Sequence, residues 1–194
     1  MMKMRAVILM GVLVSSVAYA DQGEWLVRGR VINVQPKESS ALNLTVDNAY
    51  IPEVDFSYFV SKNVALELIL ATSRHTVSLG GGSLGNVSVL PPTLTAQYHF
   101  SPDATIRPYV GAGINYTHFY GNDLKVGTQS AGLDNGSWGG ALQAGVEPAI
   151  SRNSFINIDI KKIYIKTDVT LGGSKIDTLR LDPVVLGVGY GMKF

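Results

Sequence analysis

The chain ends with Leu186-Gly187-Val188-Gly189-Tyr190-Gly191-Met192-Lys193-Phe194. Apolar or aromatic side chains alternate here with glycine or lysine, which is the period-two pattern of a β-strand with one apolar face. A final strand of this kind that stops at an aromatic residue is typical of closed β-barrels in bacterial outer membranes. The inward residues Gly187, Gly189 and Gly191 are expected to leave space, so that the barrel stays partly hollow.

Seven further segments alternate in the same way, so the sequence predicts an all-β protein, an eight-stranded antiparallel transmembrane β-barrel. Short turns near residues 61–63, 101–103 and 151–153 alternate with longer polar stretches, as in barrels with brief periplasmic turns and long extracellular loops. The expected strands cover residues 25–34, 53–60, 64–71, 93–100, 106–120, 138–147, 156–165 and 179–194. The expected loops cover residues 35–48, 74–89, 121–136 and 167–178.

Charged side chains fall almost only on the second face of these strands. If the apolar face contacts lipid, this face lines the lumen, where charges are costly unless they pair with one another. The alternative is a soluble, lipocalin-like barrel, which would put the charges outside and give Phe194 no reason to end the chain. The lumen charges expected in the barrel are Glu53, Asp55, Glu67, Asp159 and Lys161.

Residues 1–20 resemble a cleaved secretory signal, because Lys3 and Arg5 precede an apolar run and Ala18-Tyr19-Ala20 forms a small-residue cleavage site. The alternative, an uncleaved anchor, is disfavoured because the run is too short to span about 30 Å of hydrocarbon as a helix. Residues 21–194 are then expected to form one outer-membrane barrel domain.

Composition narrows the function classes. Of 194 residues, 46% are apolar and none is cysteine, which excludes disulfides, thiolate chemistry and cysteine metal sites. Removing Lys3 and Arg5 lowers the basic count from 16 to 14 against 15 acidic residues, so the mature net charge is −1. This balance argues against a nucleic-acid partner.

Five segments together resemble the OmpW family of outer-membrane proteins. They are Leu90-Pro91-Pro92-Thr93-Leu94, Pro108-Tyr109-Val110-Gly111-Ala112-Gly113-Ile114-Asn115-Tyr116, Ser137-Trp138-Gly139, Leu181-Asp182-Pro183 and Gly189-Tyr190-Gly191-Met192-Lys193-Phe194.

The resemblance implies a location in the cell outer membrane, among its lipids, and a narrow channel that passes small hydrophobic molecules and releases them sideways. It also implies links to stress responses and to toxin or phage docking. The C-terminal pattern resembles the signal read by the barrel-assembly machinery, carried by Leu186, Val188, Tyr190, Met192 and Phe194.

Both termini are expected at the periplasmic end, which orders the lumen residues by height. Near that end, Arg28, His99, Arg107 and Glu147, with Lys193, are expected to form a charged plug. Farther out, an apolar lumen is expected from Ile69, Ala71, Ile163 and Ile165. Lys161 faces this apolar stretch; it either narrows the channel or is simply salt-bridged, to Asp159 or Glu67.

A solute stopped by a plug needs another exit. Neither Pro91 nor Pro92 offers an N–H to the ladder, so the pair is a candidate lateral opening. The alternative interpretation is that the two prolines only mark the start of the fourth strand, above the membrane.

Two other function classes remain. An enzyme is disfavoured, because no serine is expected to converge with a carboxylate and His75, His99 or His118, and neither a phosphate loop nor metal-ligand spacing is present, so no cofactor or metal is expected. A surface-interaction protein, whose loops bind a toxin or phage while the barrel serves as an anchor, stays open.

Overall fold

The computed structural model describes residues 23–194, and the predicted signal peptide, 1–20, lies outside these residues. Residues 23–194 contain fifteen strands: β1 (Trp25–Gln35), β2 (Leu44–Val46), β3 (Ala49–Phe59), β4 (Val64–Ala71), β5 (Ser73–Leu79), β6 (Gly82–Leu90), β7 (Thr93–His99), β8 (Ile106–Tyr120), β9 (Lys125–Val126), β10 (Gln129–Leu133), β11 (Gly136–Pro148), β12 (Ser154–Ile163), β13 (Lys166–Leu171), β14 (Ser174–Arg180) and β15 (Val184–Lys193). In this described range, no helix has the length and apolar character needed to cross a membrane.

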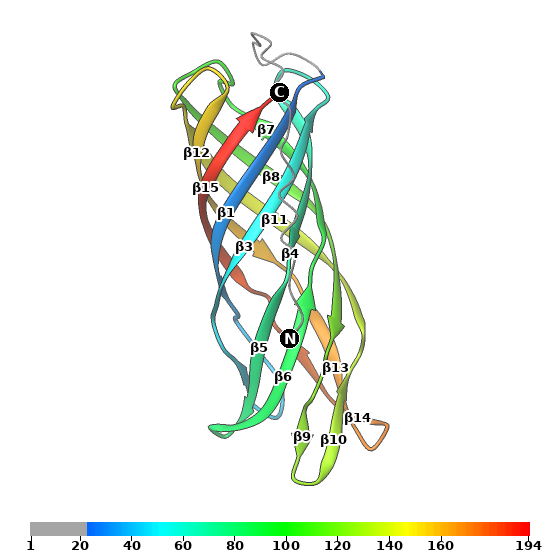
Figure 1. Ribbon diagram of the computed structural model, residues 1–194. Coiled ribbons are helices and arrows are strands. Elements are labelled where there is room, and N and C mark those ends of the chain that lie inside the picture. Colours follow the sequence, from blue (N-terminus) through cyan, green and yellow to red (C-terminus); the bar gives the residue numbers. More distant parts are fainter. Residues whose placement is uncertain (1–22) are drawn as a thin grey trace, which may run out of the picture.

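Eight of these strands form a closed antiparallel ring (Figure 1). Their order is β11-β12-β15-β1-β3-β4-β7-β8, and β8 pairs with β11 to close the barrel. The chain returns to its first strand at the end, where Val27 pairs with Met192 and Val31 with Val188. The predicted eight-stranded antiparallel barrel is confirmed.

The two ends of the barrel differ (Figure 1). One, the turn end, carries the short connections 60–63, 100–105 and 149–153 together with the C-terminus. The other, the hairpin end, carries the long extensions β5–β6, β9–β10 and β13–β14.

Around the ring, the outward side chains are apolar and exposed, and aromatic residues gather near both of its rims. Two such bands flank the lipid-facing surface of membrane barrels. The band at the turn end contains Trp25, Tyr58, Tyr98, Phe100 and Phe194, and the other contains Tyr50, Tyr116, Trp138 and Tyr164.

The long connections are strands rather than the predicted loops. Only residues 44–46 of the first connection are extended, but 74–89, 121–136 and 167–178 form most of three β-hairpins. Their alternation is inverted: Val77, Val87 and Val169 point inward and are buried, while the polar neighbours face out. A polar outer face around an apolar core is the pattern of a soluble barrel. The hairpin strands therefore lack the apolar outer face by which the ring strands were predicted.

The last predicted strand, 179–194, is also interrupted. Leu181–Pro183 separates β14 from β15, because Pro183 has no N–H for the ladder and Asp182 has a φ of 33°. The Asp182 carboxylate accepts the N–H of Ile165 at 3.0 Å. Ile165 lies in the matching break between β12 and β13, so both strands of this hairpin change course at one level.

Candidate functional site

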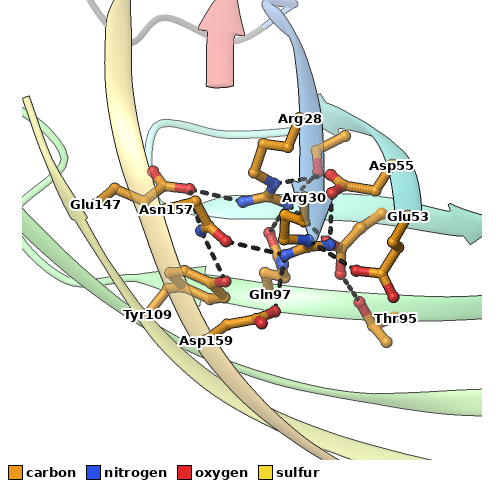
Figure 2. A network of polar contacts seen from close by, with 12 residues as sticks. Arg28, Arg30, Glu53, Asp55, Thr95, Gln97, Tyr109, Glu147, Asn157 and Asp159 are labelled. Atoms are coloured by element: carbon orange, nitrogen blue, oxygen red, sulfur yellow. Dashed lines mark hydrogen bonds and ion pairs between the residues drawn. The ribbon is translucent and has the colours of Figure 1, made fainter. Parts of the chain in front are cut away.

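The lumen near the turn end is filled by buried ion pairs (Figure 2). Arg28 of β1 is fully buried, and its guanidinium contacts three carboxylates from three other strands. The distances are 2.7 Å to Asp55, 2.7 Å to Glu67 and 2.6 Å to Glu147. Such partners offset the cost of burying the charge.

Arg30 forms a second centre one inward position farther along β1. Its guanidinium lies 2.7 Å from Glu53, 2.5 Å from Asp55 and 2.7 Å from Asp159. Lys161 extends the network toward the hairpin end, at 2.8 Å from Glu53 and 2.9 Å from Asp159. Lys161 is therefore salt-bridged, which was one of the two interpretations of the sequence, and its partners are Asp159 and Glu53.

Neutral side chains from the other strands of the ring complete this network of ion pairs. Gln143 and Thr95 donate to the second oxygen of Glu67 at 2.6 and 2.8 Å, and Asn157 donates to the Tyr109 hydroxyl at 3.0 Å. We call the connected set the charged floor: Arg28, Arg30, Glu53, Asp55, Glu67, Thr95, Gln97, Tyr109, Gln143, Glu147, Asn157, Asp159 and Lys161.

The inward glycines of β15 make room for this floor, which corrects the expectation that they keep the barrel hollow. A Cβ on Gly189 would lie 2.6 Å from Cγ of Arg30, and one on Gly191 would lie 2.9 Å from Cγ of Arg28. The space beside Gly189 is therefore filled by the Gly29 backbone and the Arg30 stem, and the space beside Gly191 by the Phe155 ring and the Arg28 stem.

The residues predicted for the plug are divided by the structure. Arg28 and Glu147 lie in the charged floor. His99 lies at its edge, stacked on Tyr109 with ring centroids 5.1 Å apart and 3.9 Å from Glu147. Arg107 lies outside it, because its guanidinium donates to the Ala104 carbonyl and sits over Phe155.

Arg30 is the central residue that sequence reasoning left without a role, although the alternation placed it inward. The alternation of their strands likewise placed Gln97, Gln143 and Asn157 inward. Alternation within a strand does not give the register between strands, and it is this register that brings these side chains to one level.

Above the charged floor, the lumen becomes apolar. A cavity of about 60 Å³ lies there, and Ile69, Ala71, Ile163 and Ile165 all line it. The other lining residues are Ile32, Val34, Pro36, Val46, Ile51, Glu53, Ser73, His75, Val89, Pro91, Thr93, Leu181, Pro183 and Val185.

The apolar lining continues to the tip of the hairpins. A second cavity, of about 20 Å³, is enclosed there by aliphatic side chains such as Leu44, Leu124 and Leu179. Both cavities belong to one buried hydrophobic cluster. Asp177 ties the 36–43 segment to β14: partial burial opposes its charge, but N–H groups of Leu42, Thr178 and Ala41 outweigh that effect and hold its pKa below the usual value.

The barrel wall is interrupted beside the first cavity. β4 and β7 pair as far as Ile69 and Thr93, and β5 and β6 begin to pair at Ser73 and Val89. Within the described range 69–93, the stretches 70–72 and 90–92 between these pairs form no ladder with each other. Pro91 lines the cavity at this break, whereas Pro92 follows it toward β7.

One cluster contradicts the expectation that no serine, histidine and carboxylate converge. His75 Nε2 lies 2.9 Å from Ser73 Oγ, and Nδ1 lies 3.0 Å from the Asp47 carbonyl and 3.5 Å from its carboxylate. Sequence reasoning missed it because it treated residues 74–89 as a loop. Among residues 23–194, no group of three or more metal-ligating side chains has metal-binding geometry.

The comparisons with known proteins agree with this geometry. The profile described as "OmpW family" matches residues 21–194. The chain belongs to the OmpW family. It is 36% identical to Outer membrane protein W of Escherichia coli K12, over 94% of each chain.

Two more comparisons bear on fold and context. The crystal structure of outer membrane protein OprG from Pseudomonas aeruginosa matches with a TM-score of 0.81 and 28% identity, over 90% of this chain and 97% of that one. The "Dibenzothiophene metabolism operon protein PahQ" of the same species is 27% identical over 93% of each chain. The protein is thus an outer-membrane β-barrel in contact with lipid.

Proposed function

We propose that this barrel gives passive passage to small hydrophobic or amphipathic molecules, which enter at the hairpin end and leave sideways into the membrane. The observation that carries the proposal is the two-part lumen. The buried hydrophobic cluster that lines both cavities, which we call the apolar column, extends from the hairpins to the charged floor. The charged floor is centred on Arg28 and Arg30.

The two parts have opposite effects on a greasy solute. The apolar cavity favours binding of such a solute. Displacing the side chains of the charged floor, in contrast, would leave buried charges without partners, at a cost of several kcal/mol. Straight passage toward the turn end is therefore blocked, and the solute must leave through the wall.

The break beside Pro91 and Pro92 is the proposed exit. It borders the cavity and lacks ladder hydrogen bonds between residues 70–72 and 90–92, which supports this proposal. The name of the relative PahQ, which refers to a dibenzothiophene metabolism operon, favours an apolar aromatic solute.

The exit is tested by the double variant Pro91→Ala/Pro92→Ala, which restores two N–H groups and allows the ladder to close. We expect protein-dependent uptake of radiolabelled benzene into liposomes to fall severalfold. Pro108→Ala is the matched control, because Pro108 lies in β8 opposite Val146 near the turn end, away from the break. Wild-type uptake by the double variant would refute the lateral exit.

Insertion is proposed to use the C-terminal strand. Leu186, Val188, Tyr190 and Phe194 are exposed on its outer face, with Met192 between them, and this continuous apolar face is the proposed signal for the barrel-assembly machinery. The rival function, docking of a toxin or phage by the hairpins on an inert barrel, predicts no solute uptake.

A further inference from the structure

The cavity above the charged floor is lined by four polar side chains, and two of them, Glu53 and Thr93, already contact other polar groups of the protein. Glu53 forms an ion pair with Arg30 at 2.7 Å and accepts a hydrogen bond from Lys161 at 2.8 Å. Thr93 donates to the Pro91 carbonyl at 3.0 Å and accepts from Asn115 at 2.8 Å. The remaining two, Ser73 and His75, form the only other polar group among the lining residues that the structure describes.

The hydrogen on each His75 nitrogen follows from its neighbours. Nδ1 lies 3.0 Å from the Asp47 carbonyl oxygen, which can only accept, so Nδ1 carries the proton. In the neutral ring Nε2 is then an acceptor, and the Ser73 hydroxyl 2.9 Å away donates to it.

The Ser73 hydroxyl donates its only hydrogen to His75, but its oxygen still has two lone pairs that can accept hydrogen bonds. Among residues 23–194, no second hydrogen bond reaches this oxygen. Because the side chain is buried and lines the cavity, water competes little for it. Ser73 Oγ is thus a fixed hydrogen-bond acceptor on this part of the cavity wall.

The position of Ser73 is as important as its chemistry. It pairs with Val89 at the first ladder position beyond the wall break, and Pro91 lines the same cavity. A solute that moves from the cavity to the break passes this hydroxyl.

We propose that Ser73, held by His75, selects solutes that carry one hydrogen-bond donor on an apolar body, such as a phenol or a small alcohol, over the corresponding hydrocarbon. This inference rests on the proposed passage of hydrophobic solutes. A donor that enters the cavity loses its bonds to water, and Ser73 Oγ replaces one of them.

The test compares phenol with benzene, which share the ring and differ in the donor. Protein-dependent uptake of each is measured in liposomes, with protein-free liposomes subtracted. Ser73→Ala is expected to lower the phenol-to-benzene uptake ratio about tenfold, the cost of one unmatched donor. Ser73→Thr keeps the hydroxyl and is expected to retain the wild-type ratio.

Ser88→Ala is the matched control, because Ser88 lies on the same hairpin but does not line this cavity. An unchanged ratio in Ser73→Ala, with both solutes still taken up, would overturn the inference and leave the proposed function standing. No uptake of either solute by the wild-type protein would overturn the proposed function and the inference together.

Discussion

At the scale of single residues, Arg28 is the side chain on which most of the floor depends. It has no exposed surface, and three carboxylates lie within 2.7 Å of its guanidinium. Arg28→Met leaves those carboxylates without their central partner, so the free energy of unfolding is expected to fall by about 3–5 kcal/mol. Urea unfolding in lipid vesicles measures the change.

The control for this prediction is Arg152→Gln. Arg152 is exposed in the turn between β11 and β12, so its loss is expected to change the unfolding free energy by less than about 0.5 kcal/mol. Equal unfolding midpoints for the two variants would contradict the role assigned to Arg28.

The same residue marks how far sequence reasoning reaches. The alternation of β1 put Arg28 and Arg30 in the lumen, and charge balance indicated that the lumen carboxylates would pair. The partners followed only from the barrel register: Arg28 meets Glu147, 119 positions away in sequence. No local pattern encodes such a contact.

At the scale of elements, the eight strands of the ring were predictable because each has an apolar face toward lipid. The hairpin extensions were not, because their apolar face turns inward above the membrane. Short segments with Ser, Gly and Asn between the apolar positions, as in β6, then look like loops.

The inverted alternation gives a prediction at neighbouring positions of β5. Val77 is 1% exposed and faces the apolar column, so Val77→Asp buries a carboxylate without a partner and should loosen the hairpin end. Ser78→Asp places the same group on the outer side. Proteolysis within the β5–β6 hairpin is expected to accelerate in the first variant only, with both barrels still folded by gel mobility.

Equal cleavage of the two variants would show that the hairpins have no fixed inner face. The apolar column above the charged floor would then lose its wall, and with it the proposed path for a solute.

At the scale of the whole molecule, two hydrophobic patterns meet inside one barrel. Near the turn end the apolar side faces lipid and the lumen is charged, whereas at the hairpin end the lumen is apolar and the outside is polar. The change occurs beside the strand breaks at Pro91 and Pro183, where the cavity lies. This change of pattern is the basis of the proposed path, in which a solute enters at the hairpin end and leaves through the wall.

The central claim is that this lumen passes apolar solutes and excludes water-soluble ones. The most direct measurement compares uptake of an alkane, benzene, glucose and a small ion by liposomes with and without the purified protein. We predict protein-dependent uptake of the alkane and benzene, with none of glucose or the ion. Passage of glucose and ions at similar rates, or no protein-dependent uptake of any solute, would contradict it.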